Sequence, residues 1–388
     1  MKWLIPLVVC ATLLSAQSGG TVTVTGEGVD LGAAKQDAMR QAVEQVLGAN
    51  LQSWGVSENF KMVKDVILTN TKGYISSAKL IDQKQLKDKW QAKMEITVSM
   101  TPLKTNATSL AQWLGGLRFL VVYDPRKVKT SEDTALYAYA RERMVQYLND
   151  QGYRCIENEV YDRFKDETFK VLEPGDTSAM DFASKLGILV DAEFMVNIFN
   201  IIMQEEPKAM GMTAMKATID TKGYDNCTAE QLGTVVGTGD ATLGMDKDRL
   251  VTLRSAIDPA MKSAAEQYNY NVVKKLTEWC NNGAPYELRF YNVDKNHMKK
   301  LVDTLIAGGD YGSQLIPVQT RSFWRLNVTY KKTAYAMWHQ IDDIAIAIGW
   351  PLETPLQYVR QMYFTPEGTT VPEVEKIVKA KTEGSQQK

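Results

Sequence analysis

One segment of the chain alternates between apolar and polar residues without an exception. Along Lys89–Met100 every second side chain is apolar, namely Trp90, Ala92, Met94, Ile96, Val98 and Met100. Because successive side chains of a β-strand point to opposite faces, this pattern predicts a strand with one buried and one solvated face. Such a strand needs a second layer on its apolar side, so the segment constrains the whole domain around it.

The residues before this strand supply the second layer. A short strand, Thr21–Thr25, turns through Gly26–Gly28 and enters a helix over about Leu31–Leu47, which carries one apolar stripe. A second amphipathic helix is expected over about Glu58–Asn70, and a strand over Gly73–Asp82 follows it. The order predicts a β-α-α-β-β domain with helices on one face of a sheet.

Two phrases in this domain, TGEGVDLGAAKQDAMRQAVEQVLG and TNTKGYISSAKL, resemble the amino-terminal domain of flagellar assembly protein T. In that family a Gly-rich turn enters a long Ala-rich helix, and a step such as Gly73-Tyr74-Ile75 enters the middle strand. The resemblance assigns residues 17–104 to such a domain. It implies a role in assembly at the cell envelope, and it implies no catalysis.

The extreme amino terminus is typical of a secretory signal peptide. Met1-Lys2 precedes the apolar run Trp3–Leu14, which is too short to span a bilayer, and Ser15-Ala16 offers a cleavage site. Cys10 follows Val9, where a lipoprotein signal has a small residue. We therefore expect a signal peptide at residues 1–16, export to the periplasm with association at the outer membrane, and no transmembrane segment after processing.

Charge and cysteine content exclude some functions. Lys and Arg number 45 against 46 Asp and Glu, so no cationic excess favours nucleic acid or an anionic membrane. The cysteines beyond the signal peptide, Cys155, Cys227 and Cys280, form no CxxC or Cys/His cluster, and no zinc site is expected. Cys227 and Cys280 are the candidates for a disulfide because both lie near ends of predicted elements, although three unpaired thiols fit equally well.

A central domain is predicted over residues 118–283, after a linker at residues 105–117. Its β-α-β-α-β-β-β-α order indicates an α/β domain. The strand ending in Val121–Pro125, the helix ending in Asp150–Tyr153 and the phrase ASKLGILVDAEFMVNI resemble a periplasmic domain. This domain is shared by the TolB amino terminus, the curli secretion lipoprotein and the lipoprotein activator of penicillin-binding proteins.

In that pattern a helix delivers the chain to a central strand. Ala183, Leu186, Gly187 and Asp191 occupy the corresponding positions here, with two additional apolar residues before the aspartate. The resemblance again implies an envelope protein.

The remaining residues, 284–366, follow a split β-α-β order that predicts a ferredoxin-like α+β domain. Its last element is expected to be one extended stretch, Gln357–Phe364. The polar tail at residues 367–388 is expected to be disordered, with at most a loose helix over Glu373–Ala380. The fold class predicted for the chain is therefore α+β and α/β multidomain.

No catalytic constellation emerges from the motifs. His339 and Asp343 are spaced i, i+4 on a helix but lack a third ligand with matching spacing. The glycines of Gly233–Asp240 resemble a phosphate loop, yet no Lys-Ser/Thr ending or following helix accompanies them, so a β-hairpin or bulge is expected. We expect the chain not to be an enzyme and to hold no cofactor or metal.

Aromatic residues are concentrated in the last domain. Most should form its core, and a partner-binding surface is the alternative, with Trp324, Trp338 and Trp350 as candidate anchors. The sequence thus predicts a secreted scaffold or assembly factor. Its expected partners are envelope proteins, including flagellar basal-body components by the resemblance, and a ring-forming homo-oligomer is one expected form. A periplasmic binding or regulatory module for cell-wall synthesis or secretion is the alternative.

Overall fold

The computed structural model describes residues 20–54, 60–123, 128–171, 179–208, 213–243, 249–308 and 311–386. The expected signal peptide lies outside these residues. The described chain divides into two compact units. The first contains residues 20–54 and 70–107, and the second contains residues 60–69 and 108–386.

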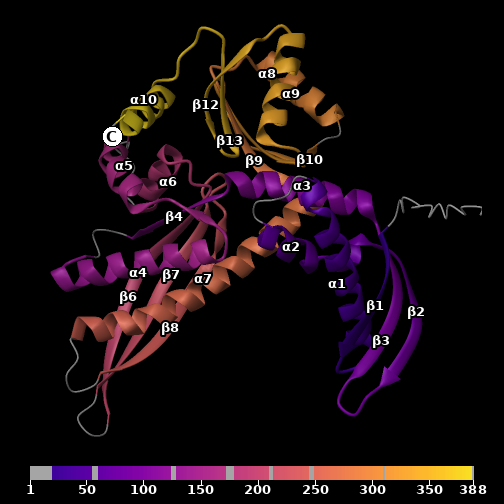
Figure 1. Cartoon of the computed structure of the whole chain (residues 1–388). Helices are drawn as coiled ribbons and strands as arrows, with labels where there is room; N and C mark the ends of the chain where they lie inside the picture. Colours follow the sequence, from indigo (N-terminus) through magenta and orange to yellow (C-terminus); the bar gives the residue numbers. More distant parts are fainter. Residues whose placement is uncertain are drawn as a thin grey trace, which may run out of the picture. The chain divides into compact units, whose positions relative to one another are not determined.

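The first unit is a three-stranded antiparallel sheet with a helix on one face (Figure 1). Its strands pair in the order β1-β3-β2. The elements are β1 (Gly20–Gly28), α1 (Leu31–Asn50), the short 3₁₀ helices η1 (Gln52–Trp54) and η2 (Thr71–Tyr74), β2 (Ile75–Gln85) and β3 (Trp90–Val98). The predicted alternation is confirmed, since Ala92, Met94, Ile96 and Val98 are buried. They face the apolar stripe of α1 that was predicted for that helix.

The glycine-rich segment before α1 differs from the expected turn. Strand β1 continues through Gly28, and a Cβ atom added to Gly26 would lie 2.2 Å from the backbone oxygen of Ala34. Glycine is required here because α1 crosses directly over the strand. The helix begins after Asp30, whose side chain accepts a hydrogen bond from the backbone N–H of Ala33 at 2.7 Å.

Two helices depart from the predicted organisation. Helix α2 (Phe60–Thr69) belongs to the second unit, where it packs against the long helix α7 (Arg249–Asn282). Helix α3 (Met100–Gly116) covers most of residues 105–117, where a linker was expected, and it buries Leu103, Leu110 and Leu114. Burial of its apolar side chains explains why this segment is an ordered helix.

The second unit begins with a five-stranded mixed sheet in the order β5-β4-β6-β7-β8. Strand β4 pairs in parallel with β5 and β6, and β6, β7 and β8 form an antiparallel meander. The strands are β4 (Arg118–Tyr123), β5 (Arg154–Cys155), β6 (Phe194–Pro207), β7 (Thr213–Asp225) and β8 (Gln231–Leu243). This is the predicted α/β arrangement.

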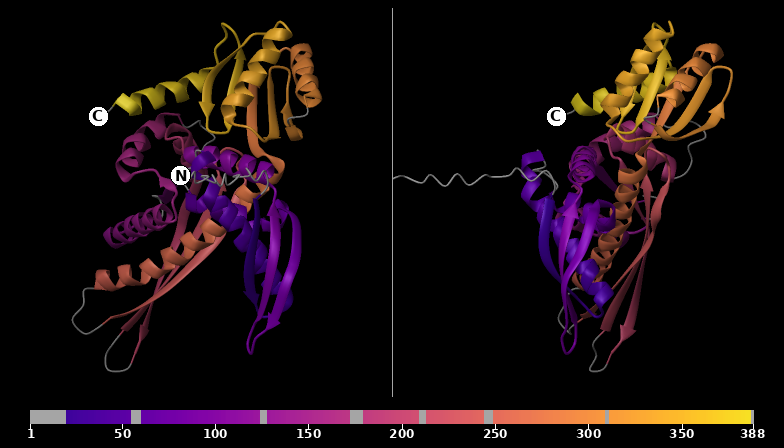
Figure 2. Two further views of the ribbon diagram at one scale, coloured as in Figure 1. Left: turned by 45° about the vertical axis from the view of Figure 1, so that its right-hand side comes forward. Right: turned by 90° about the vertical axis from the view of Figure 1, so that its right-hand side faces the viewer.

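Helices cover both faces of this sheet. Helices α4 (Ser131–Asp150) and α7 pack together on one face, with α7 running along β7 and β8 (Figures 1 and 2). Helices α5 (Asn158–Val171) and α6 (Ala179–Leu189) contribute to the core on the other face. Gly237 and Gly239 lie in β8, where an added Cβ atom would come within 2.2 Å of the α7 backbone. These glycines therefore serve strand–helix packing, as expected for a hairpin strand in place of a phosphate loop.

A second five-stranded sheet has the order β10-β11-β9-β13-β12. Its elements are β9 (Ala284–Tyr291), α8 (Lys295–Ala307), β10 (Tyr311–Gln319), β11 (Phe323–Tyr330), α9 (Ala334–Ala347), β12 (Leu352–Tyr358), β13 (Gln361–Pro366) and the terminal helix α10 (Pro372–Gln386). The predicted split β-α-β order is present in β9, α8 and β10.

One strand is added to the ferredoxin-like pattern. The expected extended stretch Gln357–Phe364 is a hairpin that turns at Val359 and Arg360, and its second strand, β13, pairs in parallel with β9. Strand β13 therefore separates β12 from β9. This insertion places the hairpin turn of Arg360 against the first sheet of the unit.

Residues 367–386 of the carboxy-terminal tail are ordered and contain a packed helix, whereas disorder was predicted for residues 367–388. Helix α10 packs against α5 and buries Val374, Ile377 and Ala380. These residues belong to a core that also contains Leu186 of α6 and Tyr358 of β12. The α/β and ferredoxin-like parts thus share one core. Within the described residues, no helix combines the length and apolar character needed to cross a membrane.

Candidate functional site

A buried arginine joins the two sheets of the second unit. Arg360 occupies the β12–β13 turn and is only 3% exposed. The residue before it, Val359, has a φ of 45°, a conformation that is strained for a β-branched side chain. Such strain persists only where surrounding contacts hold it, and the contacts of Arg360 provide that support.

Every nitrogen of the Arg360 guanidinium donates to an oxygen. Nε pairs with the carboxylate of Glu193, Nη2 donates to Oδ2 of Asp225 at 2.7 Å, and Nη1 donates to the carbonyl of Pro285 at 2.5 Å. The guanidinium carbon lies 4.3 Å from the ring centroid of Trp279. We call Arg360, Glu193 and Asp225 the clasp, because they tie the β12–β13 hairpin to the ends of β6 and β7.

The charges of the clasp are balanced within the protein. Lys275 lies 3.9 Å from Asp225 and also pairs with Glu230. Burial keeps the pKa of Glu193 above its usual range, although the charge of Arg360 acts in the opposite direction. Burial alone would lower the pKa of Arg360, but Asp225 and Glu193 raise it well above its ordinary value, so it remains charged.

Hydrogen bonds extend the clasp along the same hairpin. The amide of Asn226 donates to the hydroxyl of Tyr358 at 2.7 Å, and the amide of Gln361 donates to the carbonyl of Cys227 at 2.7 Å. Tyr358 in turn donates to the carbonyl of Ala192. The hairpin is therefore fixed on both sides of Arg360 to the turn that follows β7.

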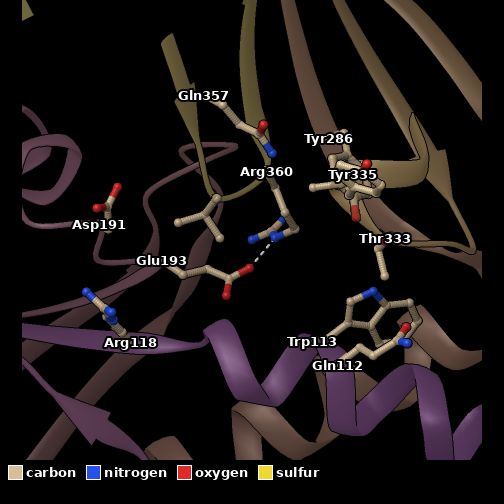
Figure 3. Close-up of a pocket in the computed structure, with 12 residues that line it drawn as sticks. Gln112, Trp113, Arg118, Asp191, Glu193, Tyr286, Thr333, Tyr335, Gln357 and Arg360 are labelled. Carbon is tan, nitrogen blue, oxygen red and sulfur yellow. Dashed lines mark hydrogen bonds and ion pairs between the residues drawn. The ribbon is translucent and has the colours of Figure 1, made fainter. Parts of the chain in front are cut away.

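A cleft of about 440 Å³ opens beside the clasp (Figure 3). Residues from α3, β4, the β12–β13 hairpin and the start of α9 line it. They are Gln112, Trp113, Arg118, Asp191, Glu193, Tyr286, Thr333, Ala334, Tyr335, Gln357, Val359 and Arg360.

Most charges in the cleft wall have partners. Asp191 pairs with Lys381, and Glu193 pairs with Arg360. Arg118, which is exposed, has no ion-pair or hydrogen-bond partner for its guanidinium among the described residues. Within the described part of the chain, the cleft wall therefore carries one uncompensated cation.

Aromatic side chains provide the apolar part of the wall. Trp113 meets Trp279 edge to face at 5.9 Å, and its indole N–H is buried without an acceptor in the described part of the chain. Tyr335 is 67% exposed, and in Figure 3 it lies across the cleft from Trp113. The combination of apolar rings with a few polar groups is typical of small-molecule sites.

The structure places the predicted tryptophans apart from this cleft. Trp324 and Trp350 are 5% and 7% exposed and lie in the core of the ferredoxin-like part, so they offer little surface to a partner. Trp338 is half-buried, and its indole N–H donates to the Thr354 hydroxyl at 2.8 Å. Partner binding by Trp338 stays a prediction.

The other predicted positions do not line the cleft, although His339 packs against Tyr335 of its wall. His339 contacts the rings of Tyr335 and Trp338 on α9. Cys155, Cys227 and Cys280 are free thiols, and the structure does not contain the Cys227–Cys280 bridge. In the part of the chain that the structure describes, no three His, Cys, Asp or Glu side chains gather in an arrangement that could hold a metal ion.

Sequence reasoning missed the clasp. The sequence does contain a sign of these buried charges. Arg360 interrupts the apolar stretch Tyr358–Phe364, and Glu193 stands directly before the apolar start of β6. An ionisable residue inside an apolar segment is rarely buried without a partner. The pairing itself joins positions 135 and 167 residues apart, which no local pattern reveals.

Comparison with known proteins adds no assignment. No protein-family profile matches the chain, and no curated protein sequence matches it. Solved structures with partial likeness include a minor lipoprotein from Acinetobacter baumannii, with 10% identity over 40% of this chain and 92% of that chain and a TM-score of 0.24. A hypothetical protein from Chlamydia trachomatis shows 15% identity over 42% of this chain and 97% of that chain, also with a TM-score of 0.24. Likeness at this level supports no argument, so function is argued from the chain's own residues.

Proposed function

We propose that the chain is a secreted, non-enzymatic scaffold of the bacterial envelope. The observation that carries this proposal is the clasp, because it ties the ferredoxin-like part to the α/β part through buried ion pairs. In some proteins, buried ionic groups fix the register of the elements that they join. A scaffold needs that property, since its contact surfaces must keep a constant geometry while partners bind.

Sequence features support the location and the partner class. The apolar run Trp3–Leu14 supports export, and the resemblance of residues 17–104 to flagellar assembly protein T supports a role beside the flagellar basal body. The half-buried Trp338 on α9 is the contact residue that we propose for the partner.

The proposal is tested in the native cell by fractionation and crosslinking. The intact chain should be recovered from the envelope, and Leu7→Arg, which interrupts the apolar run, should keep it in the cytoplasm. After mild crosslinking, mass spectrometry should identify basal-body proteins, with a lower yield from Trp338→Ala. Tyr270→Ala serves as the matched control because Tyr270 is 65% exposed on α7. Cytoplasmic recovery of the intact chain would refute the proposal.

A binding or regulatory module is the second candidate function, and the cleft is the observation that favours it. The cleft lies where the α/β and ferredoxin-like parts meet, and Trp113, Tyr286 and Tyr335 line it. Recovery of cell-wall synthases or secretion components in the same crosslinking experiment would favour this candidate over the flagellar role.

A further inference from the structure

We propose that the sheet of the ferredoxin-like part carries a second contact surface, which binds an acidic, extended segment of a partner protein. This surface consists of Val318 of β10, Phe323 and Arg325 of β11, and Arg289 and Tyr291 of β9. We call these five residues the open face. The inference goes beyond the scaffold function, because it concerns the side of the sheet that faces away from α9 and Trp338.

The alternation of β11 defines the open face. Along Phe323–Tyr330 every second residue is buried, and the last of these, Tyr330, donates a hydrogen bond to the side-chain oxygen of Gln340 on α9 at 3.1 Å. The residues between them point to the other side of the sheet and are half-buried. Phe323 and Arg325 therefore point away from α9 and are partly accessible.

Two arginines lie side by side on the open face. The pairing of β11 with β9 places Arg325 directly opposite Arg289. Like charges in opposite positions destabilise a sheet. Glu287 compensates Arg289, since Oε1 of Glu287 accepts a hydrogen bond from Nε of Arg289 at 2.6 Å. The charge of Arg325 needs a second anion.

The described part of the chain does not supply that anion. No carboxylate among the described residues pairs with Arg325, and its Nε is buried without an acceptor. Nε is the only nitrogen of Arg325 that is both buried and without a partner, so its two Nη groups are accessible. A guanidinium presents its donors in a planar fork that matches a carboxylate. We therefore expect a carboxylate of the partner to pair with Arg325.

Apolar side chains flank this charge. The rings of Phe323 and Tyr291 meet with their centroids 4.9 Å apart, and Val318 lies directly opposite Arg325 on the other neighbouring strand. Arginine and aromatic residues are enriched in protein–protein interfaces and often dominate their binding energy. Because these groups are spread over three strands of a sheet, they match a protein segment better than a small molecule.

The spacing along β11 defines the pattern of the segment. Phe323 and Arg325 are alternate residues of one strand, so their side chains lie about 6.8 Å apart. Alternate side chains of an extended segment have the same spacing. An apolar residue on Phe323 therefore places the side chain two positions away on Arg325, and that side chain should be Asp or Glu.

A defined peptide tests this pattern with the purified secreted chain. The probe is Ac-Ser-Leu-Ser-Glu-Ser-Leu-Ser-Glu-Ser-NH2, and its binding is measured by saturation-transfer NMR titration. Arg325→Gln should weaken binding about tenfold, the effect of one charge-assisted hydrogen bond. Arg325→Lys keeps the charge without the planar fork and should retain part of the affinity. Arg321→Gln, at an exposed arginine outside the open face, is the matched control and should bind as the wild type does.

A photocrosslink tests the same surface in the native envelope. With p-benzoylphenylalanine in place of Phe323, the crosslinked peptide of the partner should contain an apolar residue and, two positions away, Asp or Glu. Arg325→Gln should lower the crosslinking yield, whereas Arg321→Gln should not.

Several outcomes would overturn the proposal. They are failure of the probe peptide to bind, equal binding by Arg325→Gln and the wild type, and no crosslink from position 323. Crosslinks that join two copies of this chain, or that attach a nucleic acid or a glycan, would also overturn it. Because the peptide titration uses purified protein, its outcome is independent of the location and basal-body contacts tested above.

Discussion

The guanidinium of Arg360 and the carboxylate of Asp225 lie 2.7 Å apart, although 135 residues separate them in the chain. Asp225 ends β7 in the α/β part, and Arg360 occupies a hairpin turn of the ferredoxin-like part. Both side chains are almost fully buried. This pair therefore couples two parts that the sequence presents as separate domains.

Removal of the arginine should destabilise the second unit strongly. Arg360→Met leaves the carboxylates of Glu193 and Asp225 buried without their cation, which costs about 3–5 kcal/mol of the free energy of unfolding. Urea unfolding followed by tryptophan fluorescence measures this loss. Arg249→Met is the matched control, because Arg249 makes only exposed ion pairs with Glu132 and Glu205, each worth less than about 1 kcal/mol. Equal losses in the two variants would contradict a special role for the clasp.

Two glycines near α1 should respond to alanine in opposite directions. Gly26→Ala places a Cβ atom 2.2 Å from the α1 backbone, and relief of this overlap costs about 1–3 kcal/mol. Gly48→Ala meets no atom within 4 Å on the exposed face of α1 and should stabilise the helix by about 0.5–1 kcal/mol. Thermal unfolding of both variants checks the prediction. Stabilisation by Gly26→Ala would show that α1 does not approach β1 so closely.

The first unit could be predicted from the sequence because its information is local. The alternation along Lys89–Met100 and the stripe on α1 each specify one face of one element. Gly26 shows the limit of local information, since a glycine required by a crossing helix is indistinguishable in sequence from a glycine required by a turn. The predicted order of the elements was therefore correct, but the predicted end of strand β1 was wrong, because the strand continues through Gly28.

The second unit was harder to predict because its decisive contacts are distant in sequence. The tail looked too polar to fold alone, yet Val374, Ile377 and Ala380 give α10 a narrow apolar stripe that α5 covers. Similarly, Gln357–Phe364 alternates too little to show a turn, and Val359 is an unfavourable residue for the left-handed conformation that the hairpin requires. The contacts of Arg360 override that local preference, and only the tertiary structure reveals them.

Loss of one buried side chain from α10 should reveal its contribution to stability. Ile377→Ala removes a 2% exposed side chain from the shared core and should cost about 2–5 kcal/mol of unfolding free energy. Val378→Ala, on the neighbouring and 36% exposed position, should change stability by less than about 0.5 kcal/mol. Denaturation in urea distinguishes the two. If Ile377→Ala left the free energy of unfolding unchanged, α10 would not be packed in the shared core, and the tail would be disordered as its composition suggested.

All three thiols should be unpaired, but they should react only slowly with alkylating reagents in the native state. Burial raises the pKa of Cys155 and of Cys280 to about 12 and that of Cys227 well above its ordinary value. At pH 8 a thiol with a pKa of 12 is a thiolate in roughly one molecule in ten thousand, and the thiolate is the form that alkylates. Iodoacetamide should therefore modify the native secreted chain very slowly at this pH, whereas Ser53→Cys, at an exposed position, should add one rapidly modified thiol.

In urea without reductant, Cys155, Cys227 and Cys280 should all react. Reaction of Cys155 alone would show that the secreted protein forms the Cys227–Cys280 disulfide.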